Sequence, residues 1–295
     1  MNKLLLYIFI LCMAFSTNAQ TQRFTYEYKF AIDSTRRDSI KTELMILDVS
    51  KSGSKYYSKT KFESDSILMA EINKSIKMGS GSLQIKSSGY RGRVNYTIEK
   101  NYPDYKTYLL TNVGAIGGNN KYRVFDDRKM TWKIFPDKQK IGEFNTQKAE
   151  ATFAGRKWIA WFTTEIPFQD GPYKLRGLPG LIVKAESSDK THIMELKGIK
   201  KVNDQQSSAS APPDLPIFKN KPLDITQAQY AKLEEQYKKD PGQSMREMLG
   251  NPGSKVNLIM DGKAVTDTNE MIRKIEQKTK ERFKKENNLI ELKLE

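Results

Sequence analysis

Two carboxylates, Glu165 and Asp170, lie five residues apart in a segment rich in proline and glycine. Paired carboxylates divide acid and base work in many hydrolases, so this pair is a candidate for cleavage of peptide or glycan. Carboxylates in such loops also cap turns or pair with neighbouring lysine and arginine. Both interpretations stay open from the sequence.

The chain has one histidine, His192, and one cysteine, Cys12. This composition excludes a Cys/His metal cluster, and His192 is expected to be a structural or surface residue in a strand. The sequence has no G-x-S-x-G elbow, no P-loop and no G-x-G-x-x-G fingerprint. We therefore assign no catalytic residue, no metal ligand and no cofactor, and enzymatic activity stays an open question.

The first residues have the pattern of a secretory signal. Lys3 precedes an apolar run from Leu4 to Phe15, and small residues lead up to Ala19. This pattern predicts cleavage after Ala19. We expect an exported protein that is periplasmic or associated with the outer membrane.

The 50 Lys and Arg against 35 Asp and Glu give a net charge of +15, while 10% of residues are aromatic. That aromatic content is too high for a disordered chain. Export and the interleaving of basic with acidic residues argue against nucleic acid as a partner. A diffuse positive field favours anionic head groups, so peripheral membrane contact is compatible with the sequence.

Short alternating segments predict an antiparallel sheet. Phe24, Tyr26, Tyr28 and Phe30 alternate with polar residues, as in a strand with one buried face. Residues 43–50 and 55–62 flank a Lys-Ser-Gly-Ser turn and predict a hairpin. Repetition of this pattern gives roughly ten short strands, spaced as in a barrel, a half-barrel or a sandwich.

Helical signals interrupt and follow these strands. An apolar pattern after Ser64 predicts one inserted helix that ends near Gly79. Thr226 with Gln229, and Asp267 with Glu270, have the spacing of capping boxes. The C-terminal helices have too few apolar residues to fold alone, so we expect them to pack on the sheet.

The predicted class is α+β, with a mainly antiparallel, curved sheet. We divide the chain into a signal peptide (1–19), a sheet domain (20–202), a Pro-rich connection (203–225) and a helical extension (226–295).

Residues 161–182 carry the most distinctive motif. Its prolines fix φ and its glycines permit tight backbone approaches, so the segment is predicted to be a rigid loop between two strands. We expect this loop to bind a ligand or partner. The candidate binding residues are Trp161, Glu165, Pro167, Asp170, Gly171, Pro172, Leu175, Gly177, Leu178, Pro179 and Gly180.

The run from Gly177 to Ile182 resembles the signature of the GLPGLI family, a group of exported Bacteroidota proteins of largely unknown function. Residues 154–156, 161–167, 171–172 and 286–291 are also similar to the family pattern. The resemblance implies an accessory of outer-membrane transport. One departure is Gln147, where many members carry a cysteine, so any thiol role in relatives is absent here.

We favour a non-enzymatic envelope protein that binds an outer-membrane transporter or an apolar or anionic ligand. The alternatives are a hydrolase that uses Glu165 and Asp170, and a purely structural assembly factor. The aromatic residues of the strands either fill a core or line a ligand site on a concave sheet face beneath the helices.

Overall fold

The computed structural model describes residues 20–78, 92–114, 121–203, 221–250, 258–260, 263–265 and 267–294. The predicted signal peptide lies outside these residues, and its cleavage stays a prediction. The strands of the main sheet are β1 (Gln20–Ala31), β2 (Ile40–Val49), β3 (Gly53–Ser58), β4 (Thr97–Asn101), β5 (Lys106–Asn112), β6 (Lys121–Asp126), β7 (Lys133–Ile141), β8 (Phe144–Phe153), β9 (Arg156–Thr163), β10 (Leu181–Ser187), β11 (His192–Asn203) and β12 (Leu223–Thr226).

These strands form one 12-stranded sheet in the order β12-β6-β5-β4-β3-β2-β1-β11-β10-β9-β8-β7. All neighbours are antiparallel except β12 and β6. Over the described residues β7 and β12 remain separate edges, so the sheet is curved and open. The predicted class is confirmed, and the open form is the half-barrel among the sequence alternatives.

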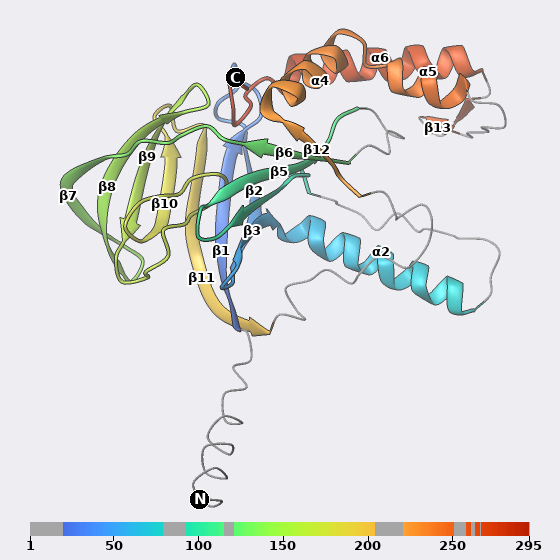
Figure 1. The fold of residues 1–295 in the computed structure, drawn as a ribbon. Coiled ribbons are helices and arrows are strands. Elements are labelled where there is room, and N and C mark those ends of the chain that lie inside the picture. The colour runs from blue at the N-terminus through green and yellow to red at the C-terminus, as the bar shows by residue number, and fades with distance from the viewer. Residues whose placement is uncertain are drawn as a thin grey trace, which may run out of the picture.

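The helices are α2 (Lys59–Lys77), α4 (Gln227–Lys239), α5 (Gln243–Gly250) and α6 (Thr268–Lys285), and a small hairpin joins β13 (Leu258–Met260) to β14 (Lys263–Val265). Helices α4, α5 and α6 gather at one end of the sheet, whereas α2 projects away from β3 (Figure 1). After α6 the chain returns to the sheet beside these helices (Figure 1), where the Asn288 amide meets the Ile32 carbonyl after β1 and the Leu292 amide meets the Ala154 carbonyl after β8.

The alternation in β1 has the predicted effect, because Phe24, Tyr26 and Tyr28 are buried on the inner face of the sheet. A β-bulge between Thr25 and Tyr26 shifts the register of β1 against β11. Bulges increase the local twist of a strand, which helps the sheet to curve around its core.

The loop between β9 and β10 folds onto the inner face of the sheet and fills it. Phe168 meets Phe24 edge to face, with 6.0 Å between the ring centroids. Leu175 and Leu178 are fully buried. The Leu181 amide donates to the Ile166 carbonyl at 3.1 Å, which closes the loop at its base. The aromatic strand residues therefore form a core together with this loop.

Helix α2 begins earlier than the sequence predicted. It starts at Lys59 and takes over residues 59–62, which were expected to continue the hairpin strand. The reason is Ser58, whose Oγ accepts from the Lys61 amide at 3.1 Å and caps the helix. The hairpin itself is confirmed, because β2 and β3 pair as predicted.

The C-terminal helix starts follow their caps. Thr226 and Gln229 form the predicted capping box, with reciprocal bonds of 3.2 and 2.8 Å. Asp267 caps α6 through the Asn269 and Glu270 amides, but Glu270 pairs with Lys274 instead of completing the box. Residues 223–225 of the expected connection form β12 together with Thr226, and the sequence did not predict this strand. The division into four segments stays a prediction.

The loop base yields a stability test. Gly180 has φ +148°, and a Cβ there would lie 2.0 Å from the Thr163 carbonyl oxygen. We expect Gly180→Ala to lower the free energy of unfolding in urea by about 3–4 kcal/mol. Gly177 is the matched control, because its φ is +90° but nothing lies near the added Cβ. Gly177→Ala should cost about 1–2 kcal/mol. Equal losses would contradict the close packing at Gly180.

Candidate functional site

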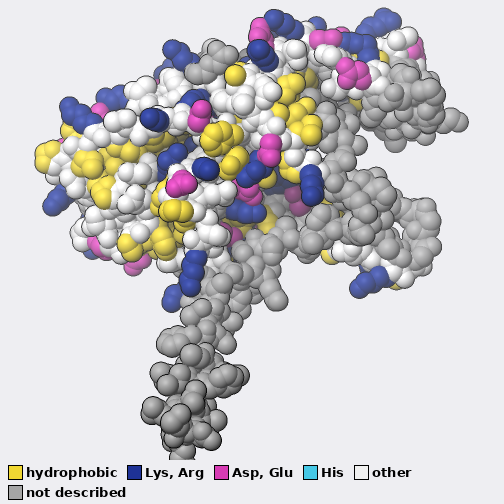
Figure 2. Space-filling model, viewed as in Figure 1, with side chains coloured by type: hydrophobic (Ala, Val, Ile, Leu, Met, Phe, Trp, Pro, Cys, Tyr) yellow, Lys and Arg dark blue, Asp and Glu magenta, His cyan; other side chains and the backbone are white. Residues whose placement is uncertain are grey.

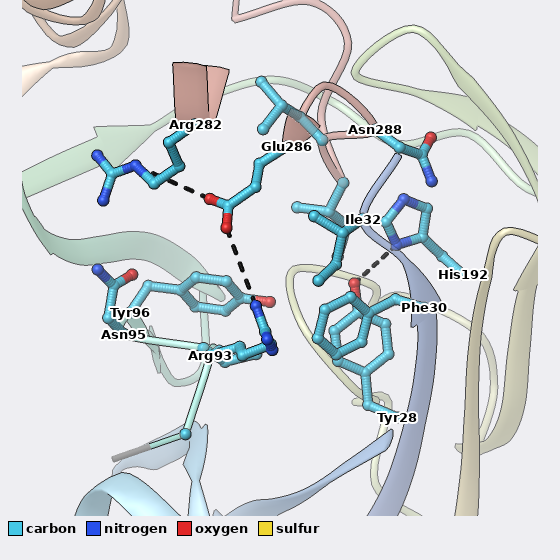
Figure 3. Close-up of a pocket in the computed structure, with 14 residues that line it drawn as sticks. Tyr28, Phe30, Ile32, Arg93, Asn95, Tyr96, His192, Arg282, Glu286 and Asn288 are labelled. Atoms are coloured by element: carbon cyan, nitrogen blue, oxygen red, sulfur yellow. Dashed lines mark hydrogen bonds and ion pairs between the residues drawn. The ribbon is translucent and has the colours of Figure 1, made fainter. Parts of the chain in front are cut away.

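A cavity of about 400 Å³ opens between the end of β1, residues 92–96 and the C-terminal segment. Figure 3 shows its walls, with aromatic side chains from the sheet on one side and charged side chains from α6 and Arg93 on the other. This is the size of a small-molecule site.

The floor of the cavity is aromatic. Tyr28 and Phe30 stack with their centroids 4.6 Å apart, and the ring of His192 lies nearly parallel to Tyr28 at 6.0 Å. The Tyr28 hydroxyl and His192 Nδ1 share a hydrogen bond of 2.7 Å. Ile32, Val94 and other apolar side chains complete the walls. The floor therefore offers apolar contact with few free polar groups.

His192 is only 1% exposed. Burial, with a further contribution from the Arg156 charge, lowers its pKa to about 3. The imidazole is therefore neutral at physiological pH. The Asn288 backbone opposes this lowering of the pKa without cancelling it. The sequence predicted a structural or surface histidine, and the structure shows a buried one.

Two arginines and one carboxylate lie together at the opening of this cavity, which we call the mouth. Arg93 NH1 lies 3.9 Å from Glu286 Oε1, and Arg282 Nε lies 3.9 Å from Glu286 Oε2 (Figure 3). The side chains of Arg93, Glu286 and Arg282 are 43%, 43% and 51% exposed. Two positive charges face one negative charge here, so the cluster has an excess of one positive charge. Contacts this long and this exposed are weak, so both arginines can interact with an incoming anion.

A second cavity, of about 460 Å³, continues from the first. The two share the mouth arginines, Glu286, Tyr96 and parts of the C-terminal segment. Beyond the mouth the lining changes to Tyr230, Tyr237, Glu234 and Lys238 of α4. Burial raises the pKa of Glu234, and Lys238 and Tyr230 oppose that shift. The shared lining places the two cavities next to each other, and we refer to them together as the groove, which has different chemistry at its two ends.

The C-terminal segment that walls the groove is tied to the sheet. The Asn288 amide donates to the Ile32 carbonyl at 2.9 Å, and Asn288 Nδ2 donates to the Ala31 carbonyl at 2.8 Å. Arg156 donates to Asn288 Oδ1 at 2.7 Å and to the Leu289 carbonyl. In the sequence, residues 286–291 had suggested only a family resemblance, because nothing local shows what they contact.

The two carboxylates considered for acid–base work lie in different surroundings. Asp170 is completely buried and accepts from Lys100, from Ser54 Oγ and Tyr102 OH at 2.5 Å each, and from the Gly171 amide at 2.6 Å. Glu165 is exposed and accepts from the Asn145 amide and side chain at 3.0 and 3.1 Å. Asp170 has no oxygen left for chemistry, so this pairing is not supported.

The other predicted binding residues divide into two sets. Gly171, Pro172, Leu175, Leu178 and Gly180 are buried with Asp170 in the core and cannot touch a partner while the loop stays folded.

The remaining candidates are more accessible. Pro167, Gly177 and Pro179 are exposed with Glu165, and Trp161 is partly exposed. Trp161 alternates with the buried Ala160 and Phe162, so it lies on the outer face of β9. None of these five residues lines either cavity, and their binding role stays a prediction.

Among the residues that the structure describes, no cluster of three or more His, Cys, Asp or Glu side chains is arranged to hold a metal ion. None of the described helices combines the length and apolarity needed to cross a membrane.

Buried His192 predicts an acid sensitivity. Folded His192 takes up a proton only near pH 3, whereas the unfolded chain does so near 6.5, so protonation of the unfolded state removes stability as pH falls through this window. From pH 6.5 to 4.5 the wild type should lose about 2–3 kcal/mol more than His192→Gln. Urea titrations across this range measure the difference, and carboxylates titrate in both proteins. Parallel curves would refute a buried neutral histidine.

Residues 126–184 match the model of a family described as a protein of unknown function (Porph_ging). Structures of PNGF-II in space groups C2 and P21 give TM-scores of 0.47 and 0.45, with 16% and 17% identity, and each alignment covers 75% of this chain and 34% of the other. The chain thus spans about a third of those proteins, and likeness at this level carries no argument about activity. No curated protein sequence matches the chain.

Proposed function

We propose that the protein is an exported, non-enzymatic binding protein whose groove takes an amphipathic ligand with an anionic group. The observation that carries this proposal is the cavity at the end of β1. Its aromatic floor suits an apolar body, and Arg93 and Arg282 with one shared carboxylate suit an anion. The ligand class agrees with the apolar or anionic envelope ligand expected from the sequence.

Charge on the face shown in Figure 2 supports a small ligand over nucleic acid. On the face shown in Figure 2, Lys and Arg side chains are scattered among acidic and apolar ones without a continuous basic stripe. A nucleic-acid-binding face gathers its basic residues along one patch or groove. Peripheral contact with anionic lipid surfaces is compatible with this distribution and would bring the protein close to such a ligand.

Family membership and a partner belong to the same proposal. The motif from Gly177 to Ile182 and the match to a family of unknown function support a GLPGLI-type exported protein. An accessory role for an outer-membrane transporter would use the exposed turns of the motif loop, around Glu165 and Pro179. A hydrolase has less support, because Asp170 is enclosed by four donors away from both cavities.

The binding proposal is tested with 8-anilinonaphthalene-1-sulfonate, an anionic aromatic probe whose fluorescence rises in apolar surroundings. The double variant Arg93→Gln/Arg282→Gln should weaken probe binding at least about tenfold, because it removes the charges that meet the sulfonate. Glu286→Gln should strengthen binding, because it removes the competing carboxylate. Fluorescence titration at low ionic strength measures both effects.

The control is Arg273→Gln, which removes an exposed arginine from the same helix away from the groove. It should leave the probe affinity unchanged. Equal affinities for wild type and the double variant would overturn the assignment of the arginines as the anion site.

A further inference from the structure

The groove changes character along its length. At one end Tyr28, Phe30, Ile32 and Val94 present aromatic and aliphatic surface. In the middle, Arg93 and Arg282 outweigh Glu286 by one charge. A ligand that follows the groove must therefore place an apolar part first and an anion second.

The far end has different requirements. Lys238 stands against Glu234 at this end, and Glu291, which also lines it, is paired with Lys174 and Arg128. This end therefore gives a second anion no net attraction. Tyr230 and Tyr237 add hydroxyl groups and aromatic faces, and Thr111 and Asn112 add further polar side chains. Such a mixture of donors, acceptors and rings suits an uncharged group with many hydroxyls.

We infer that the ligand is a three-part amphipath, in which an apolar chain is joined through a phosphate diester to a neutral polyhydroxylated group such as a sugar or a polyol. The chain occupies the cavity over Tyr28 and Phe30, and the phosphate lies between Arg93 and Arg282. The hydroxylated group extends to α4 beside Glu234. This inference rests on the proposed function and specifies the ligand of the same site.

Two lysophospholipids with the same acyl chain separate the contributions. Lysophosphatidylinositol carries a polyol beyond its phosphate, whereas lysophosphatidic acid ends at the phosphate and bears at least as much negative charge. If charge and chain alone determined binding, lysophosphatidic acid would bind at least as tightly. The inference predicts that lysophosphatidylinositol displaces the sulfonate probe at an about tenfold lower concentration, below the micellar range of both lipids.

A matched pair of variants on α4 localises the preference. Glu234→Leu removes the partly buried acceptor at the far end, and Glu235→Leu changes its exposed neighbour, which pairs with Lys239 on the surface. Glu234→Leu should abolish the preference for the inositol lipid and leave the affinity for lysophosphatidic acid within about twofold. Glu235→Leu should leave both affinities unchanged.

Each outcome has a distinct meaning. A tenfold preference that is lost only in Glu234→Leu supports the inference. Equal affinities, tighter binding of lysophosphatidic acid, or a preference that survives Glu234→Leu overturns it. If the sulfonate probe binds and neither lipid displaces it, the three-part ligand is wrong while the anionic site stands. If the probe itself does not bind, the proposed function fails.

Discussion

Two buried lysines form ion pairs that join distant segments of the chain. Lys100 and Asp170 are both 0% exposed and paired with each other, and Lys174 Nζ lies 2.7 Å from both Asp126 and Glu291. A charge buried without its partner would cost several kcal/mol, roughly 3–5 by comparison with other buried pairs. The sheet strands β4 and β6, the motif loop and the C-terminal segment are therefore held in one arrangement.

That constraint explains where the open space lies. The motif loop, which connects β9 to β10, packs on the inner face of the curved sheet. The space enclosed by the sheet is therefore a packed core. The C-terminal segment is held in place by Glu291 and Asn288 and passes over the end of β1. The same contacts position α6, which directly precedes this segment. The groove forms between this segment and the aromatic end of β1. The loop motif thus supports the candidate site without lining it, apart from Tyr173 in the second cavity.

Patterns among neighbouring residues predicted much of the fold. The features that the sequence did not predict depend mostly on contacts between residues far apart in the chain. Alternation in residues 24–30 and the box at Thr226 act within a few residues, so the sequence predicts them. Ser58 lies in a segment whose residues alternate as in a strand, so its role as a helix cap was not predicted. Strand β12 has only four residues, which is too few to show an alternating pattern. No local signal links Lys100 to Asp170 or Arg93 to Glu286, so the loop was expected to bind where it in fact packs. The mouth arginines were missed for the same reason.

The central claim is that the filled sheet leaves one anion-binding groove at the end of β1, and native mass spectrometry tests it most directly. Protein purified gently from its native source should carry a reproducible excess mass that organic solvent releases. The Arg93→Gln/Arg282→Gln variant, purified in the same way, should lack that mass. A bare mass for the wild type, or the same excess in both proteins, would contradict the account.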